Sequence, residues 1–190
     1  MLSVLMSLYH KEKPEYFHKA MESIWTNQTL RPDEIILVED GALSENLYSS
    51  INYWKEQIGT KLVSVPLPKN MGLAFALNEG LKVAKGDFIA RMDTDDIAEP
   101  ERFKQQIEFL QQNSDIDAVG CWICEIDEND SVINDKVEYP IFHNELYQFF
   151  EKRDPLAHPT AMFRKVFFDK AGGYSTEVAL AEDTLLWYQA

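Results

Sequence analysis

Basic residues are scarce in this sequence of 190 residues. Eighteen Lys and Arg are set against 32 Asp and Glu, which gives a formal net charge of −14 at pH 7. Nucleic-acid binding depends on clustered Lys and Arg that neutralise phosphates, so this balance argues against a nucleic-acid partner. A small ligand that carries phosphates would need a cation between itself and the protein.

Long hydrophobic runs are also missing. None approaches the roughly 18 apolar residues of a membrane-spanning helix, and the apolar start Leu2–Leu8 has neither a basic segment before it nor a small-residue cleavage site after it. The chain is therefore expected to be cytoplasmic and soluble. Its length predicts one domain around one core, since a domain averages roughly 150 residues.

Only two cysteines occur, Cys121 and Cys124, at the C-x-x-C spacing of some redox and zinc sites. They lie in an apolar run, 118–124, within an extended stretch predicted over 118–126. The run is typical of a strand, where residues three apart point to opposite faces. A redox pair prefers a helix N-terminus, and a zinc site needs two further ligands nearby. The favoured interpretation is two core or half-buried thiols.

Short apolar runs alternate with segments of helical periodicity in the first part of the chain. After the first run, for example, Phe17, Ala20, Met21 and Ile24 follow the spacing of one helix face. Four successive β-α units predict an α/β fold with a mostly parallel sheet covered on both faces, followed by a small antiparallel excursion. The predicted strands are 2–8, 34–39, 62–67 and 88–92, the excursion covers 118–140, and later helices cover 144–151 and 166–171.

Carboxylates follow the fourth predicted strand, where Asp93, Asp95 and Asp96 stand within four residues. Ligands of open α/β sheets bind outside the carboxyl ends of the strands. Three such carboxylates repel one another unless a cation is present, and hard oxygen ligands suit Mg²⁺ or Mn²⁺. The alternative is a simple turn and helix-cap cluster, since Asp is favoured in both. The position after an apolar strand favours a metal site that bridges to a diphosphate.

Two other strand ends carry candidate nucleotide contacts. Asp40 could accept a hydrogen bond from a ring N–H of a base, and Tyr9 could stack on that base. Each residue alone is a weak signal, because Asp before Gly forms turns and Tyr is often merely half-buried.

Near the end of the chain, Glu182 and Asp183 open an expected helix. Acidic residues are favoured in a first helical turn, and the functional alternative is a general base that removes a proton from an acceptor hydroxyl. His158 could line the acceptor side, although a lone His is more often structural. Residues 185–190 read as first helical turns without a capping residue, so a C-terminal truncation is expected.

Nearly the whole chain resembles the family 2 glycosyltransferases with the GT-A fold, in particular the bacterial enzymes of exopolysaccharide, capsule and O-antigen assembly. The resemblance rests on ordered motifs at family-like spacing. These are Gln28-Thr29 with 34–41, 70–73 with 76–81, 84–96 with its Asp93-Thr94-Asp95, Pro100-Glu101-Arg102, 158–164, Gly172-Gly173-Tyr174 and 182–187.

The resemblance implies a Rossmann-like GT-A catalytic domain over 1–190, with a nucleotide-binding half, 1–96, and an acceptor-side half, 97–190. It implies metal-assisted inverting transfer of a hexosyl or N-acetylhexosaminyl group from a nucleotide sugar, usually UDP-linked, to a glycan or lipid-linked acceptor. Mn²⁺ or Mg²⁺ is the implied cofactor. A part beyond residue 190 would supply acceptor contacts or peripheral contacts with the inner face of the plasma membrane.

The resemblance also assigns roles to individual residues. The metal contacts are Asp95 and Asp93, and the catalytic base is Asp183, with the adjacent Glu182 as the reserve candidate. The nucleotide-binding candidates are Ser7, Tyr9, Glu39, Asp40, Asn70 and Asp93.

The sequence departs from the family pattern at two positions. Glu39 replaces the usual first Asp of the paired acids after the second strand, which alters the expected nucleotide fit. Leu77 stands where many relatives carry Arg before the Asn, so a role of that Arg toward the diphosphate is unfilled or moves to Lys69 or Arg91.

Two rival functions stay open at this stage. A nucleotidyltransferase would want a Gly-rich basic loop after the first strand, and Tyr9-His10-Lys11-Glu12 contains no glycine. A non-catalytic nucleotide-sugar-binding or assembly subunit could use the same fold. The intact acids at Asp93, Asp95 and Asp183 favour catalysis.

Overall fold

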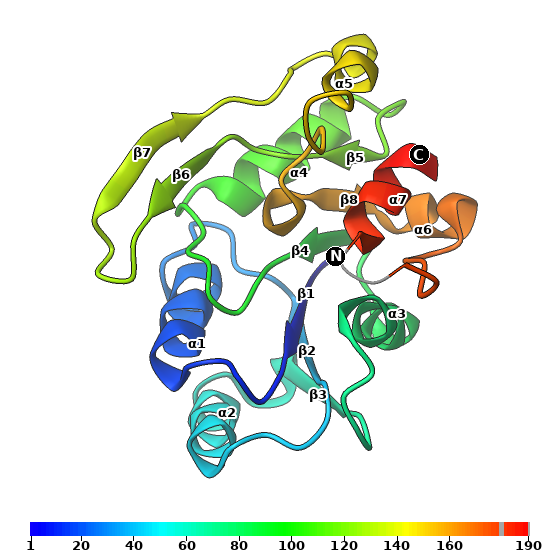
Figure 1. The fold of residues 1–190 in the computed structure, drawn as a ribbon. Coiled ribbons are helices and arrows are strands. Elements are labelled where there is room, and N and C mark those ends of the chain that lie inside the picture. Colours follow the sequence, from blue (N-terminus) through cyan, green and yellow to red (C-terminus); the bar gives the residue numbers. More distant parts are fainter. Residues whose placement is uncertain (179–180, 190) are drawn as a thin grey trace.

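The computed structural model describes residues 1–178 and 181–189 (Figure 1). Strand–helix units fill the first part of the chain, as the hydrophobic pattern predicts. Their bounds are β1 Leu2–Leu8, α1 Pro14–Met21 with a π-helical turn Glu22–Thr26, β2 Glu34–Glu39, α2 Glu45–Ile58 with a 3₁₀ turn Gly59–Lys61, β3 Leu62–Pro66, α3 Leu73–Val83, β4 Phe88–Arg91 and α4 Arg102–Gln112.

The later part is more irregular. It contains β5 Ala118–Val119, β6 Ile123–Ile126, β7 Val132–Val137, α5 His143–Phe149, a 3₁₀ turn His158–Thr160, β8 Met162–Arg164, α6 Lys165–Ala171 and α7 Glu182–Gln189. Within the described ranges, no helix is long and apolar enough to cross a membrane.

The main sheet has six strands in the order β3-β2-β1-β4-β8-β5. β1 pairs in parallel with both β2 and β4, β2 pairs in parallel with β3, and β8 is antiparallel to both β4 and β5. The carboxyl ends of the first four strands therefore meet at one edge. The direction of strand succession reverses between β1 and β4, and such a reversal opens a crevice for ligands in open α/β sheets.

Two apolar layers cover the two faces of this sheet. On one face, α1, α2 and α4 pack through residues such as Phe17, Ile51 and Phe103. On the other, α3, α6 and α7 pack through residues such as Leu77 and Phe167. Figure 1 shows α1 and α2 on one side of β1 and β2, with α3 on the opposite side. The predicted α/β class with helices on both faces is confirmed.

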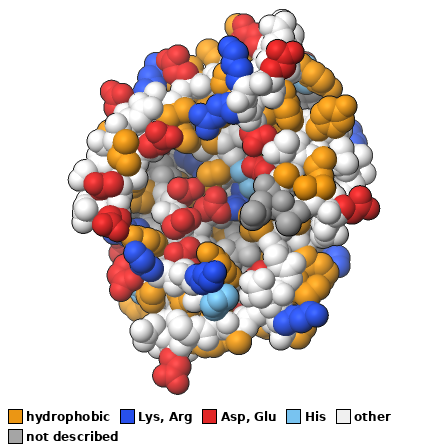
Figure 2. Space-filling model, in the orientation of Figure 1, with side chains coloured by type: hydrophobic (Ala, Val, Ile, Leu, Met, Phe, Trp, Pro, Cys, Tyr) orange, Lys and Arg blue, Asp and Glu red, His pale blue; other side chains and the backbone are white. Residues whose placement is uncertain are grey.

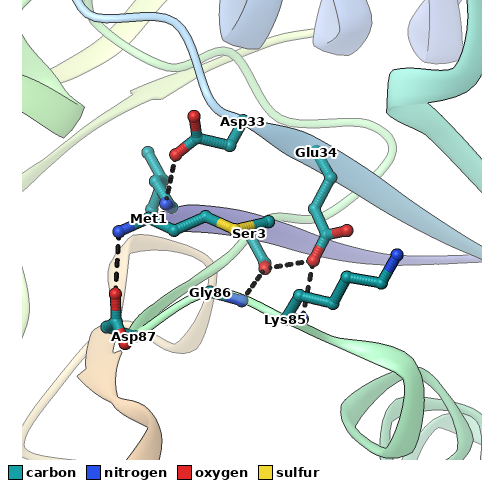
Figure 3. Close-up of polar contacts among 8 residues, drawn as sticks. Met1, Ser3, Asp33, Glu34, Lys85, Gly86 and Asp87 are labelled. Carbon is teal, nitrogen blue, oxygen red and sulfur yellow. Dashed lines mark hydrogen bonds and ion pairs between the residues drawn. The ribbon is translucent and has the colours of Figure 1, made fainter.

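The opposite edge of the sheet, where the parallel strands begin, is fastened by a buried polar network (Figure 3). The Ser3 hydroxyl donates to Oε1 of Glu34 (2.6 Å) and accepts from the backbone N–H of Gly86 (2.8 Å). The same Glu34 oxygen accepts from the backbone N–H of Lys85 (2.7 Å). One buried carboxylate and one hydroxyl thus join the starts of β1 and β2 to the loop before β4.

The prediction of one continuous strand over 118–126 is wrong. β5 joins the main sheet, whereas β6 pairs with β7 in a separate two-stranded sheet. The chain leaves the main sheet at Gly120, where an added Cβ would lie 2.9 Å from Leu156, and the backbone N–H of Cys121 donates to the Thr160 hydroxyl (3.0 Å). The Thr160 side chain, and not a neighbouring strand, therefore accepts the hydrogen bond of the Cys121 N–H.

This break also corrects the placement of the cysteines. Cys121 is half-buried and lies outside any strand, so the alternation argument does not apply to it, and Cys124 in β6 is exposed rather than half-buried. Both thiols are free. β7 ends three residues before the predicted end of the excursion, and α5 ends two residues before its predicted end, close to the usual uncertainty of an element boundary.

Candidate active site

The carboxyl edge of the parallel strands carries the polar residues that the sequence singles out. In the orientation of Figure 1, the molecule is hollowed near the middle of one face, and Asp and Glu side chains gather beside the hollow (Figure 2). The loops after β1, β2, β3 and β4 all begin at this edge, because these strands run parallel.

Asp40, directly after β2, fastens the loop that follows β3. Its Oδ1 accepts from the backbone N–H of Met71 (2.6 Å), and its Oδ2 accepts from that of Gly72 (3.0 Å). The side chain of Asn70 donates to the Asp40 carbonyl (3.3 Å). Asp40 is 3% exposed, and its carboxylate holds the loop after β3 through these hydrogen bonds, while its contact with a nucleotide base stays a prediction.

Gly41 allows the two loops to approach this closely. Its φ is +86°, and an added Cβ would lie 2.5 Å from the backbone nitrogen of Asn70. Only glycine fits both the conformation and the space. The Asp-Gly pair after β2 is thus a structural junction between two loops of the site.

The remaining nucleotide-binding candidates differ in accessibility. Ser7 is half-buried at the end of β1, and the Tyr9 ring, packed edge-on against His10, is 42% exposed and open to stacking. Asn70 is exposed. Glu39 is buried and accepts a hydrogen bond from the Ser64 hydroxyl of β3, so its carboxylate is engaged within the sheet.

The acid cluster after β4 is built around a buried arginine. The Arg91 guanidinium, 1% exposed, pairs through Nη2 with Oδ1 of Asp93. Its Nε and Nη1 have no hydrogen-bond partner among the described residues. Asp93 therefore has one oxygen directed at the buried guanidinium. Asp95 and Asp96 lie at the surface, where neighbouring atoms still reduce the hydration of their carboxylates.

Uncompensated negative charge accumulates in this cluster. Loss of hydration raises the pKa of Asp96 to about 6, with further contributions from the charges of Asp93 and Asp95. The same loss of hydration, followed by the charges of Asp93 and Glu12, raises the pKa of Asp95. Carboxylates in such surroundings gain from a bound cation.

Glu12 belongs to this cluster, although the sequence did not single it out. It lies in the loop after β1, and its Oε2 accepts a hydrogen bond from the Thr94 hydroxyl (2.7 Å). Only its place after an apolar strand could have indicated this role. The contact joins the ends of β1 and β4 at the point where the sheet reverses its strand succession.

The donor set suits a divalent cation shared with a diphosphate. Among the described residues, no group of three or more His, Cys, Asp or Glu is arranged to hold a metal by itself. Mg²⁺ is typically bound through one or two carboxylates together with substrate phosphates, and Asp93 and Asp95 offer that number of hard ligands. Burial, followed by the charge of Asp93, raises the pKa of Asp95, so a cation bound beside these carboxylates would favour their charged forms.

Glu182 and Asp183 open α7, and their environments differ. Glu182 is buried, whereas Asp183 is half-buried, with its Oδ1 accepting from the backbone N–H of Thr184 (2.8 Å). Burial raises the pKa of Asp183, the nearby Asp154 adds to the increase, and Arg91 opposes it. The carboxylate of Asp183 is thus partly removed from solvent at the start of α7.

His158 takes the structural role that the sequence left as its alternative. It is 7% exposed, its Nε2 lies 3.0 Å from the Tyr174 hydroxyl, and its ring packs edge-on against Trp187 of α7. Burial, followed by the charge of Arg91, lowers the pKa of His158 well below its usual value. The neutral His158 ring therefore packs against α7 through Trp187.

The structure shows where Leu77 lies, the residue that stands in place of the Arg of many relatives. Leu77 is fully buried in the layer between α3 and the sheet. The suggestion that Arg91 contacts the diphosphate in its place is not supported, because Arg91 is buried behind Asp93. Lys69, which is exposed in the loop after β3, remains a candidate for that role.

A separate, mostly apolar cavity of about 830 Å³ borders α7. Its walls include Val119, Trp122, Phe150, Leu156 and Trp187. The rest of the lining also includes the polar residues His143 and Lys170.

The arrangement defines a class: an α/β domain with the GT-A fold. The fold is similar to that of S. aureus TarS 1–349 in complex with UDP, with a TM-score of 0.73 at 18% identity over 98% of this chain and 53% of that one. It is also similar to the mannosyltransferase PcManGT from Pyrobaculum calidifontis in complex with GDP-Man and Mn²⁺, with a TM-score of 0.69 at 19% identity over 97% of this chain and 50% of that one.

Within that class, the chain belongs to glycosyl transferase family 2, whose family model matches residues 3–172. It is 41% identical over 187 residues to the amylovoran biosynthesis glycosyltransferase AmsE of Erwinia amylovora, across 98% of this chain and 68% of that relative. It is 36% identical over 190 residues to the Escherichia coli UDP-Gal:alpha-D-GlcNAc-diphosphoundecaprenol beta-1,3-galactosyltransferase, across 99% of this chain and 66% of that relative.

The chain spans about two thirds of the length of these curated relatives and about half of the solved structures. Family membership confirms the resemblance that the sequence motifs indicate. It also argues against a nucleotidyltransferase.

Proposed function

We propose that the chain carries the donor-binding and catalytic groups of an inverting glycosyltransferase that uses a UDP-sugar. This proposal is carried by two carboxylate positions: Asp93 pairs with the buried Arg91 at the carboxyl ends of the parallel strands, and the half-buried Asp183 opens α7. A donor-side carboxylate and an acceptor-side carboxylate are the two parts that such a transfer needs.

The donor side lies on residues 1–96. We assign the uracil ring of the donor to the surface between the exposed Tyr9 ring and Asp40. Ser7, Glu39 and Asn70 are the remaining nucleotide-binding candidates. The residues that would hold a divalent cation are Asp93 and Asp95. Bound together with the donor diphosphate, Mn²⁺ or Mg²⁺ would neutralise charge on the departing UDP.

The acceptor side lies on residues 97–190. Asp183 accepts the proton of the acceptor hydroxyl as its oxygen forms a bond to the anomeric carbon. The bond from that carbon to the phosphate oxygen breaks at the same time, and UDP leaves with the electron pair. Attack from the face opposite the leaving group inverts the anomeric configuration. Glu182 is the reserve base, and its burial places it second.

The curated relatives support a role in bacterial surface polysaccharide synthesis. One is named for amylovoran biosynthesis, and another is named as a galactosyltransferase from UDP-Gal to a diphosphoundecaprenol-linked sugar. By analogy, we propose a hexosyl or N-acetylhexosaminyl donor, a glycan or lipid-linked acceptor, and a location on the cytoplasmic side of the membrane.

Release of UDP tests the proposal directly. The protein is incubated with Mn²⁺ and UDP-Gal or UDP-GlcNAc, with and without a GlcNAc-diphosphate-lipid acceptor, and free UDP is measured. We expect acceptor-dependent UDP release that is lost in Asp95→Asn. Tight UDP binding without any release, with every donor and acceptor, would instead support a non-catalytic binding subunit.

A further inference from the structure

An asparagine on α3 holds the backbone that leads toward α7. The Nδ2 of Asn78 donates to the carbonyl oxygen of Tyr174 (2.7 Å), and its Oδ1 accepts from the N–H of the same residue (2.9 Å). The two residues are 96 positions apart in the sequence. Because a side-chain amide offers a donor and an acceptor in one plane, it satisfies both backbone groups of Tyr174 as a neighbouring strand would.

The glycines before Tyr174 make this contact possible. Gly172 ends α6 in a left-handed conformation with φ of +80°. Gly173 has φ of +82°, and an added Cβ would lie 2.8 Å from Oδ1 of Asn78. The Gly-Gly pair therefore serves a close approach of this loop to α3, in addition to ending a helix.

The Tyr174 side chain extends the contact to α7. Its ring is 3% exposed, its hydroxyl lies 3.0 Å from Nε2 of His158, and His158 packs against Trp187 on α7. Trp187 also stacks on Phe163 of β8, with ring centroids 5.7 Å apart. A continuous chain of buried contacts thus runs from Asn78 to the helix that begins with Glu182 and Asp183.

We propose that Asn78 is a positioning residue of the transfer reaction. By holding Tyr174, it fixes α7 and the Asp183 carboxylate against the donor-binding half of the chain, to which α3 belongs. This inference rests on the proposed function, because it takes Asp183 as the base. Asn78 acts through Tyr174 and touches neither substrate nor cation.

Hydrogen–deuterium exchange tests the structural part without any substrate. Asn78→Ala removes two hydrogen bonds to Tyr174, and we expect the amides of 182–189 to exchange on the order of tenfold faster, with those of α1 and α2 unchanged. Asn52→Ala, at an exposed position on α2, is the matched control and should leave all segments unchanged. Unchanged exchange of 182–189 in Asn78→Ala overturns the proposal.

The pKa of Asp183 is a second readout, and a structural defect far from α7 would not change it. In ¹³C carboxyl NMR, Asp183 is identified by its loss in Asp183→Asn. The groups around it are Asp154, Arg91, Tyr174 and Glu182. Because burial raises the pKa of Asp183, loosening α7 in Asn78→Ala should lower it toward the ordinary value, while Asn52→Ala keeps it raised. A pKa that stays raised in Asn78→Ala overturns the proposal.

Kinetics of UDP release, with UDP-GlcNAc or UDP-Gal as the donor and the GlcNAc-diphosphate-lipid as the acceptor, complete the test. Asn78→Ala should lower kcat on the order of tenfold at unchanged KM, and should add little in an Asp183→Asn background. If the losses in kcat of Asn78→Ala and Asp183→Asn multiply in the double variant, the proposal is overturned. If Asn78→Ala does not fold, Asn78→Asp keeps the acceptor for the Tyr174 N–H, loses the donor, and faces the same criteria.

Failure of the proposed function is distinguishable from failure of this inference. A wild-type protein that binds no UDP in the presence of Mn²⁺ contradicts the proposed function and leaves the exchange and NMR results on Asn78 standing. A protein that releases UDP normally but shows no response of α7 to Asn78→Ala contradicts only the role of Asn78.

Discussion

Glu182 and Asp183 are adjacent carboxylates, and burial separates their roles. Glu182 is 9% exposed, whereas Asp183 keeps more of its surface open and has a raised pKa through burial. A general base works best when its pKa approaches the operating pH. Accessibility and ionisation therefore both favour Asp183, a choice that adjacency in the sequence could not make.

Asp183→Asn keeps the shape of the side chain and removes its basicity. In a protein with its true acceptor, we expect kcat to fall by roughly 10²- to 10⁴-fold. UDP affinity should stay near that of the wild type, because the carboxylate does not touch the nucleotide. Steady-state kinetics and calorimetry with UDP measure the two quantities, and Asp169→Asn on α6 is a control that should change neither. A loss of turnover that parallels lost UDP binding contradicts the assignment.

The pH profile gives a second check on Asp183. The base must be deprotonated, and the folded protein raises the pKa of Asp183 above the usual value for Asp. Activity should therefore fall as the pH decreases through this raised pKa, at a higher pH than an ordinary Asp would give. A profile of kcat/KM for the wild type should show this acidic limb, and the residual activity of Asp183→Asn should lack it.

Asp40 has a structural role and a proposed binding role that one variant can separate. If it also pairs with a buried ring N–H of the base, Asp40→Ala should weaken UDP binding by about 1 to 3 kcal/mol. Hydrogen exchange should also become faster around Met71 and Gly72, whose N–H groups lose their acceptor. Unchanged UDP affinity, with faster exchange and a native circular dichroism spectrum, would restrict Asp40 to holding the loop.

At the scale of elements, the start of β4 depends on a close approach at Gly86. An added Cβ would lie 2.6 Å from the backbone nitrogen of Ser3 and 2.6 Å from its hydroxyl oxygen. Gly86→Ala should therefore destabilise the fold by about 1 to 3 kcal/mol, the range of an overpacked core. Urea denaturation followed by circular dichroism measures the change.

Lys85→Ala is the matched control for Gly86→Ala. The Lys85 side chain is exposed, and the hydrogen bond to Glu34 comes from its backbone, which the substitution retains. We expect a change within about 0.5 kcal/mol. Equal stability of the wild type and Gly86→Ala would mean that the polar network at the start of the strands tolerates a shift.

The elements differ in how far the sequence predicts them. β1 to β4 and their helices have regular periods, and residues such as Phe17 and Ile24 are fully buried as the pattern requires. The segment 118–126 is as apolar as a strand but divides at Gly120, because the Thr160 side chain captures the backbone of Cys121. A partner 39 positions away leaves no trace in a local pattern.

At the scale of the whole molecule, the net charge of −14 sets a condition for binding a diphosphate. We expect calorimetry to detect UDP binding with Mn²⁺ or Mg²⁺ and little or none after EDTA, because the acid cluster repels the diphosphate. Uridine, which carries no phosphate, is the matched ligand and should bind weakly and independently of metal. Equal UDP affinity with and without EDTA contradicts the proposed cation at Asp93 and Asp95.

The sequence located most of the candidate site, because ligands gather where parallel strands end. Asp40, Asp93 and Asp95 follow apolar runs, and that position alone marked them. Glu12, His158 and Asn78 could not be assigned in this way. Their roles depend on contacts with Thr94, Tyr174 and the backbone of Tyr174, which lie 82, 16 and 96 positions away.

The sequence by itself determined the α/β class, the sheet-edge location of the acid cluster and the family, because periodicity and short motifs are local properties of a chain. Only the tertiary structure decided that the buried Arg91 pairs with Asp93, that Asp40 is engaged with the loop after β3, and that α7 is joined to α3 through Tyr174 and His158. Charge and hydrogen bonding act through space, so these relations exist only once distant segments are packed together.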